Sequence, residues 1–185
     1  MSTPKSSPVV PILNSRDHIR GASAAPITLV EYGDFECPHS RAASDVVEDI
    51  RRRMGEQLRF VYRHFPVVNI QPHAERAAEA AEAAAAQGEF WPMHDLLFVR
   101  QEALDDDDLL LYAADLDLEL TRFANDLASR RYGPRVWEDV MSGTHSGVEG
   151  TPTFFINGER HIGGYDLPSL LGAVERTAAV HPRAR

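Results

Sequence analysis

Cysteine is nearly absent from this chain, whose 185 residues contain one, Cys37. A single thiol excludes an internal disulfide, so cysteine usage does not place the protein in an oxidising compartment. It also leaves no cysteine pair to hold zinc, and the eight histidines are scattered without ligand spacing. We therefore expect no metal site.

Long hydrophobic runs and an excess of positive charge are also missing. No stretch approaches the roughly 18 apolar residues of a membrane span, and the net charge is −9. This acidic balance argues against nucleic acid or an anionic membrane surface as a partner. Residues 1–25 contain no apolar segment of the kind that a secretory signal carries. The expectation is a cytoplasmic protein that neither inserts into a membrane nor binds nucleic acid.

What is present is the composition of an ordinary globular protein, with 43% hydrophobic and 25% charged residues. The length suits one domain, or one domain with a sizeable insertion. Residues 1–25 contain several prolines and are predicted to form a flexible arm, with one turn at residues 17–21. Within that arm, Val9-Val10 and Ile12-Leu13 are candidates for a short edge strand.

The most informative segment is residues 27–40, with the sequence ITLVEYGDFECPHS. Its β-branched start predicts a strand, and apolar residues at helical spacing predict a helix from Pro38 to about Met54. Cys37 therefore sits at a helix N-terminus, where the unpaired N–H groups and the macrodipole favour a thiolate. The competing interpretation is a small buried hydrophobic residue. Polar residues follow Cys37 directly, so its side chain need not be buried.

Two further residues in this segment have both a plain and a functional interpretation. Glu31 lies in the predicted strand, either on a solvated face or as a partly buried carboxylate that exchanges a proton near the sulfur. His39 is either a solvated residue of the first helical turn or a second stabiliser of the negative sulfur. The sequence leaves both pairs of interpretations open.

The remaining order of elements predicts an α/β architecture with a helical insertion. Residues 26–70 form a strand–helix–strand unit, because an alternating strand at residues 58–66 follows the helix. Residues 71–147 contain only helical patterns. Residues 148–180 contain a strand, the hairpin signal Asn157-Gly158, a returning strand over Glu159–Ile162 and a last helix that Asp166 caps. Residues 181–185 form a short tail.

Several of these residues resemble a known family. Cys37-Pro38-His39-Ser40 resembles the Cys-Pro-His-Cys active site of the DsbA-like thiol–disulfide oxidoreductases, with Ser40 in the second cysteine position. Residues 150–154 (GTPTF) resemble the family's cis-proline loop, and Glu31 falls where these proteins carry a buried acid. The resemblance covers roughly residues 25–178. It is greatest to the bacterial DsbA-like thioredoxin domain that occurs alone and fused to sodium/proton antiporters.

The resemblance implies a fold and a set of site residues. The fold is the thioredoxin fold, βαβ followed by ββα, with an all-helical insertion between the two halves. The implied partners are protein or peptide thiols and disulfides, and an extended peptide would pair with the backbone of Thr151 beside the sulfur. The implied catalytic residues are Cys37, His39, Ser40 and Glu31, and the implied substrate-binding residues are Thr151, Pro152 and Pro38.

The missing second cysteine leaves the activity open. Cys37 can form a mixed disulfide, but the hydroxyl of Ser40 cannot resolve it, so an external thiol such as glutathione is needed. No other cofactor is expected. The protein is then a monothiol oxidoreductase or isomerase, a protein capped by glutathione, or a non-catalytic binding module. Alternatively, Ser40 is an engineered replacement of cysteine.

A cysteine hydrolase is a further alternative that needs a distant histidine, and the candidates are His64, His73, His94, His145 and His161.

Overall fold

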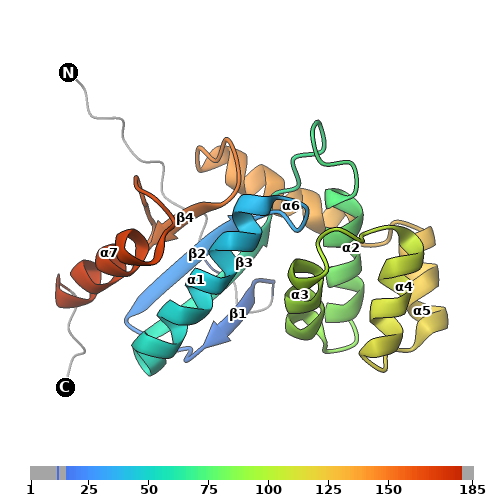
Figure 1. Cartoon of the computed structure of the whole chain (residues 1–185), viewed down its shortest axis with the longest axis horizontal. Helices are drawn as coiled ribbons and strands as arrows, with labels where there is room; N and C mark the ends of the chain where they lie inside the picture. Colours follow the sequence, from blue (N-terminus) through green and yellow to red (C-terminus); the bar gives the residue numbers. More distant parts are fainter. Residues whose placement is uncertain (1–11, 13–15, 181–185) are drawn as a thin grey trace.

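The computed structural model describes residues 12 and 16–180. Most of the edge strand expected near Val9-Val10 and Ile12-Leu13, and the whole tail at 181–185, lie outside the described residues. The described part is a five-stranded sheet with helices on both faces and a cluster of helices at one end (Figure 1).

The centre of the sheet is the predicted strand–helix–strand unit. Strand β2 (Ile27–Gly33) pairs in parallel with β3 (Leu58–His64), and helix α1 (Pro38–Met54) connects them. Strand β4 (Thr153–Ile156) then pairs antiparallel with the other side of β2. Residues from the two ends of the chain therefore meet at β2, in the order β1-β3-β2-β4-β5.

The prediction that the flexible arm extends to residue 25 is wrong. Residues His18–Gly21, predicted to be a turn, form strand β1, which pairs antiparallel with β3 at the edge of the sheet. The segment shows little strand signal because it contains one large apolar residue, Ile19. Its hydrogen-bond partners come from β3, about forty residues away, so only the tertiary structure supplies the reason for it to be extended.

The predicted hairpin is present, but its second strand is shorter than expected. Asn157 and Gly158 both have positive φ, 49° and 86°, as the tight hairpin turn requires. Strand β5 covers Glu159–Arg160 instead of Glu159–Ile162. Ile162 is 85% exposed and has no core to face, so the strand ends before it.

Each face of the sheet is covered by different helices. Alternate residues such as Leu29, Phe60 and Ile156 belong to a core shared with α1 and α7 (Leu167–Val180). The intervening residues, including Val30 and Phe155, form a second apolar cluster on the opposite face. There Tyr32 bonds Ser142 of α6 (Gly133–His145), and a Cβ on Gly143 would approach Phe65 to 2.8 Å. Helix α6 can lie this close to the sheet because residue 143 has no side chain.

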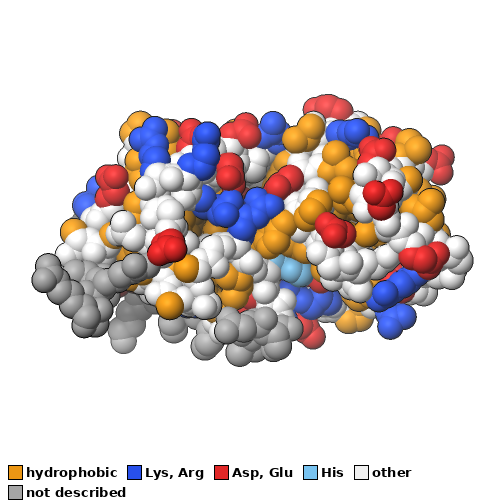
Figure 2. All heavy atoms as spheres, turned by 90° about the horizontal axis from the view of Figure 1, so that it is seen from below, with side chains coloured by type: hydrophobic (Ala, Val, Ile, Leu, Met, Phe, Trp, Pro, Cys, Tyr) orange, Lys and Arg blue, Asp and Glu red, His pale blue; other side chains and the backbone are white. Residues whose placement is uncertain are grey.

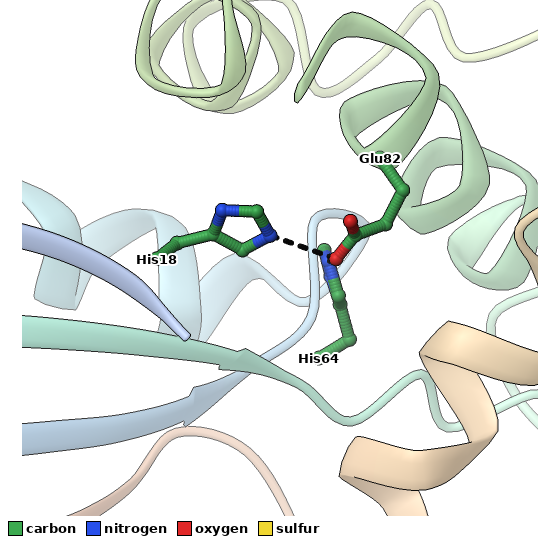
Figure 3. A group of neighbouring side chains, drawn as sticks. All are labelled: His18, His64 and Glu82. Atoms are coloured by element: carbon green, nitrogen blue, oxygen red, sulfur yellow. Dashed lines mark hydrogen bonds and ion pairs between the residues drawn. The ribbon is translucent and has the colours of Figure 1, made fainter. Parts of the chain in front are cut away.

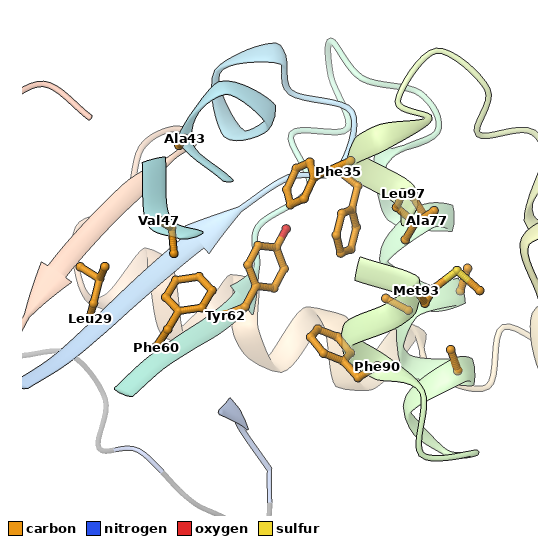
Figure 4. Close-up of a cluster of buried hydrophobic side chains, with 14 of the residues drawn as sticks. Leu29, Phe35, Ala43, Val47, Phe60, Tyr62, Ala77, Phe90, Met93 and Leu97 are labelled. Atoms are coloured by element: carbon orange, nitrogen blue, oxygen red, sulfur yellow. The ribbon is translucent and has the colours of Figure 1, made fainter. Parts of the chain in front are cut away.

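The helical insertion contains α2 to α6 and shares the main core with the sheet. Helix α2 (Ala74–Ala85) contacts each of the other four insertion helices, which its small alanine side chains permit. Figure 4 shows the apolar cluster running from Phe60 and Tyr62 on the sheet through Phe35 to Phe90 on α3. The remaining helices are α3 (Phe90–Val99), α4 (Asp106–Asp115), which has Asp105 as its N-cap, and α5 (Leu120–Ala128).

Basic and acidic side chains are interspersed over the face of the molecule drawn in Figure 2, with apolar patches between them. Within the described residues, no helix is both long and apolar enough to span a bilayer.

Candidate active site

The single cysteine lies where the sequence placed it, at the start of α1. Cys37 is the N-cap residue of the helix, with an extended backbone (φ −79°, ψ 118°), and Pro38 is the first helical residue. The thiol donates a hydrogen bond to the carbonyl oxygen of Thr151, with Sγ 3.4 Å from that oxygen. Cys37 is only 5% exposed, so the sulfur is buried although polar residues follow it directly. The approach of the loop at Thr151 explains why the sulfur is covered.

The loop that covers the sulfur is positioned by the sheet. Thr153, the first residue of β4, is the register partner of Tyr32 near the end of β2. Because the two strands are antiparallel, the residues just before β4 lie beyond the end of β2, where Cys37 follows. The Thr151–Pro152 peptide bond in this loop is cis, the conformation that the family resemblance implied. Residues 114 positions apart are thus brought together.

Ser40 and His39 point to different partners. Ser40 is fully buried, and its hydroxyl oxygen accepts a hydrogen bond from the Asp34 amide at 3.3 Å. His39 is exposed, and its Nδ1 lies 2.6 Å from the hydroxyl oxygen of Tyr165, in the segment before α7. The tyrosine therefore orients the imidazole two residues after the cysteine. Tyr165 was not among the predicted site residues.

Glu31 is buried, so the interpretation as a solvated strand position is wrong. It is 1% exposed, and burial raises its pKa to about 8. Its Oε1 atom has no hydrogen-bond partner among the described residues. Strand β2 has helices on both faces, and therefore alternation along the strand does not distinguish an inside from an outside position. The side chain lines a cavity of about 200 Å³ that also contacts α1 and α3.

Two residues that sequence reasoning missed hold the loop before Cys37. The carboxylate of Asp34 accepts hydrogen bonds from the amides of Glu36 and Val67, each at 2.8 Å. Burial nevertheless raises the pKa of Asp34 to about 6. Gln101, in the loop after α3, donates from Nε2 to the carbonyl oxygens of Phe35 at 2.6 Å and of Cys37 at 3.0 Å. An acid beside apolar residues was a usable signal for Asp34, whereas no local pattern marks Gln101.

The histidines proposed for a hydrolase lie elsewhere. His64 contacts Glu82, His94 contacts Asp95, and His73 contacts both Glu36 and Asp105. His161 Nε2 lies 3.0 Å from the carbonyl oxygen of Gly164. Over residues 12 and 16–180, no imidazole forms a hydrogen bond with Cys37 Sγ. The described geometry therefore offers no cysteine–histidine pair for acyl transfer.

A group of metal-ligand type is present away from the cysteine, although none was expected. Nε2 of His18, Nε2 of His64 and a carboxylate oxygen of Glu82 all lie within 4.8 Å of one another. These residues come from β1, β3 and α2, so sequence spacing did not connect them.

Comparison with known proteins decides the family. Residues 13–176 match the family model described as thioredoxin. The chain belongs to the thioredoxin family. This thioredoxin-family chain is 50% identical over 166 residues to the Na(+)/H(+) antiporter NhaA 1 of Salinispora arenicola. The aligned region covers 90% of the chain and 25% of the antiporter. It is 46% identical over 159 residues to the NhaA antiporter of Herminiimonas arsenicoxydans, covering 86% of the chain and 25% of that protein. The chain thus spans about a quarter of the length of these relatives.

Solved structures share the fold of this thioredoxin-family chain. Oxidised BdbD from Bacillus subtilis superposes with a TM-score of 0.80 at 20% identity, covering 89% of this chain and 94% of BdbD. The catalytic domain of ScsC from Proteus mirabilis gives a TM-score of 0.76 at 17% identity, and the superposition covers 90% of this chain and 91% of the ScsC domain. The predicted thioredoxin fold with its helical insertion and the predicted family are confirmed.

Proposed function

We propose that this protein carries out thiol–disulfide exchange through Cys37 alone. The observation that carries the proposal is the position of the sulfur, at the N-terminus of α1 and 3.4 Å from the Thr151 carbonyl oxygen. Helix N–H groups favour negative charge on the sulfur. The family supports disulfide chemistry, because the thioredoxin family includes oxidoreductases, while the monothiol mechanism is our own inference from the single cysteine.

The proposed cycle has two exchange steps. The Cys37 thiolate attacks one sulfur of a substrate disulfide, so a Cys37–substrate disulfide forms and the other substrate sulfur leaves as a thiolate that takes a proton. An external thiol, from glutathione or a protein, then attacks the mixed disulfide and releases Cys37. One disulfide is consumed and one is formed, so no further oxidant is required. Ser40 is buried and has no sulfur with which to end the cycle internally.

Glu31 is proposed to exchange a proton near the sulfur, and His39 is proposed to stabilise negative charge on it. Because burial raises its pKa to about 8, the Glu31 carboxyl exchanges a proton near neutral pH, the range in which thiols and thiolates interconvert. The His39 imidazole, oriented by Tyr165, adds a positive or dipolar group close to Cys37 along the helix. Neither role requires a metal or an organic cofactor.

The proposed substrate site is the surface around the Thr151–Pro152 loop and Pro38. This loop directly precedes β4, and the backbone there can pair with an extended peptide in the manner of an added strand. Partners are therefore protein or peptide disulfides and thiols, with side-chain contacts at Pro38 and Pro152. Binding through backbone groups would make the site tolerant of substrate sequence.

Replacement of the sulfur tests the chemistry. We expect Cys37→Ala to lose all iodoacetamide labelling and all glutathione-dependent reduction of a fluorescent peptide disulfide, while the far-UV circular dichroism spectrum is unchanged. Glutathione-dependent turnover that survives in Cys37→Ala would refute the proposal. Intact-mass analysis of protein purified without reductant identifies the group that Cys37 captures.

The second candidate is a non-catalytic peptide-binding module. The 5% exposure of Cys37 favours it, because a covered thiol reacts slowly with large substrates. The antiporter relatives also show this type of domain as part of a larger protein. A module of this kind binds peptides equally well in the wild type and in Cys37→Ala and shows no turnover with glutathione, whereas the exchange mechanism gives turnover that requires the sulfur.

A further inference from the structure

We propose that His18, His64 and Glu82 form a binding site for a divalent transition metal of the zinc type. The three donor atoms, two imidazole Nε2 atoms and a carboxylate oxygen, lie within 4.8 Å of one another. Both imidazoles are directed at the same oxygen, Glu82 Oε1, at 2.8 Å from His18 and 3.0 Å from His64 (Figure 3). This site is separate from the proposed exchange chemistry at Cys37 and does not depend on it.

Each donor is held by a different element, so the set is largely preorganised. His18 begins β1, His64 ends β3, and Glu82 projects from α2 of the insertion. The His18 ring stacks on Phe90, with centroids 3.3 Å apart and planes 3° from parallel. Zinc binds imidazole nitrogen at about 2.0–2.1 Å and carboxylate oxygen at about 2.0–2.2 Å. Small side-chain movements therefore bring all three donors onto one ion.

The ligand chemistry selects the metal class. Two nitrogens and one carboxylate oxygen suit Zn²⁺ and its neighbours Co²⁺ and Ni²⁺, whereas Ca²⁺ and Mg²⁺ prefer sets of oxygen ligands. Three protein ligands leave a fourth tetrahedral position for water. The His18 side chain is 13% exposed and the other two donors are buried, so the ion enters past His18.

The imidazoles can present a coordinating nitrogen. Each of them turns Nε2 toward Glu82 Oε1. Among the described residues, Nδ1 of His64 is buried without a hydrogen-bond partner. The neutral tautomer with its proton on Nδ1 leaves Nε2 as the nitrogen that coordinates an ion.

Each of the three arginines near the site lies close to an aspartate. Arg135 approaches Glu82 Oε1 to 3.7 Å, but it lies closer to Asp139 Oδ1, at 2.8 Å. Arg63 pairs with Asp17 at 2.7 Å. Arg16 lies between Asp17 and Asp139, at 3.8 and 3.7 Å. These two aspartates offset two of the three positive charges, and the Glu82 carboxylate offsets the third.

A bound ion would connect the edge of the sheet to the helical insertion. His18 and His64 are on neighbouring paired strands, and Glu82 is on the helix that contacts every other insertion helix. Since the metal binds only the folded arrangement of the three donors, it stabilises the native state. The prediction is a rise in thermal stability on addition of Zn²⁺, independent of the redox state of Cys37.

The test is zinc titration of the untagged 185-residue chain in the Cys37→Ala background, which removes its one thiol. We expect one Zn²⁺ per chain by calorimetry, a zinc-dependent rise in melting temperature and, with Co²⁺, the visible absorption bands of a tetrahedral complex. Glu82→Gln and His64→Gln keep hydrogen-bonding groups in place and are expected to weaken zinc binding at least about tenfold. His73→Ala and His161→Ala remove partly exposed histidines away from the site and serve as controls with unchanged binding.

Three results would overturn the site. One is a melting temperature that zinc does not move together with no binding heat. The second is zinc binding of unchanged affinity in Glu82→Gln and His64→Gln. The third is loss of zinc binding in His73→Ala or His161→Ala. Far-UV circular dichroism of the metal-free variants shows whether they fold. If Glu82→Gln unfolds, His18→Gln, which changes the most exposed donor, replaces it in the same titration.

Discussion

Glu31 and Tyr62 lie side by side as register partners on the parallel strands β2 and β3, and each holds a buried oxygen that has no hydrogen-bond partner in the described part of the chain. A Cβ on Gly33 would lie 2.9 Å from the Tyr62 hydroxyl and 3.0 Å from Glu31 Oε1, so both oxygens adjoin the same backbone. Burial raises the pKa of both groups, that of Glu31 to about 8. The neutral forms are therefore the ones that the core accommodates.

Glu31 makes stability depend on pH in a defined direction. Its ordinary pKa is 4.5, so between pH 4.5 and about 8 the unfolded chain releases a proton that the folded chain keeps. The free energy of unfolding is thus lowered as pH rises through this window. Relative to wild type, Glu31→Gln should gain stability from pH 4.5 to 8, by about 5 kcal/mol at most. Urea unfolding at several pH values measures the difference.

The matched control for this experiment is Glu175→Gln, which removes an exposed acid from α7. Its stability should remain parallel to that of the wild type across the same pH range. If Glu31→Gln also runs parallel to the wild type, the Glu31 carboxyl is ionised in the folded protein and the raised pKa is wrong.

Restoring a second thiol should create a site that cycles unaided. Cys37 and residue 40 lie within the first turn of α1, so the thiol that Ser40→Cys introduces can form a disulfide with Cys37. The Asp34 amide loses the Ser40 hydroxyl as its acceptor, at a cost of about 1 kcal/mol. We expect turnover of a small disulfide without added glutathione. The oxidised protein should weigh two hydrogens less by mass spectrometry.

Ser44→Cys is the control for the second thiol. Residue 44 is also on α1, but seven residues along a helix correspond to about 10 Å, too far for a disulfide with Cys37. It should gain a thiol and no turnover. Equal turnover in the two variants would mean that the gain in turnover comes from the added thiol itself and not from its position beside Cys37.

The buried ion pair of Asp17 and Arg63 should tie β1 to the sheet. Both side chains are 0% exposed, and two hydrogen bonds of 2.7 and 2.9 Å join them. Asp17→Asn removes the carboxylate from this buried ion pair, so the free energy of unfolding should fall by about 3 kcal/mol. In Asp49→Asn, which breaks an exposed pair with Arg52 on α1, the loss should stay below about 1 kcal/mol. Denaturant titration compares the two, and equal losses would contradict this role.

Gln101 should restrain the loop that carries the sulfur. Gln101→Ala removes both hydrogen bonds to the carbonyl oxygens of Phe35 and Cys37. We expect a loss of about 1–2 kcal/mol in stability and a several-fold faster alkylation of Cys37, because the covered thiol is released more often. Gln87→Ala removes comparable bonds to Glu119, far from the cysteine along the chain, and should lose stability without any change in alkylation. Alkylation is followed by intact-mass spectrometry, and equal rates in both variants would exclude the restraint.

Local patterns were sufficient for most of the fold. The bounds of α1 follow from Pro38, the apolar stripe and Gly55, and the hairpin follows from Asn157-Gly158. These signals act over a few residues, so the sequence shows them directly. The position of Cys37 at a helix N-terminus was predictable for the same reason. Strand β1 was missed because its reason to be extended lies in another strand.

By itself, the sequence determined the order of the elements, the helix start at Cys37 and the absence of a second thiol. Only the tertiary structure decided that Glu31 is buried, that Thr151 covers the sulfur, and that His18, His64 and Glu82 meet. The first group depends on neighbours along the chain. The second depends on which faces of the sheet are covered and which distant segments pack together, and these contacts have no local pattern.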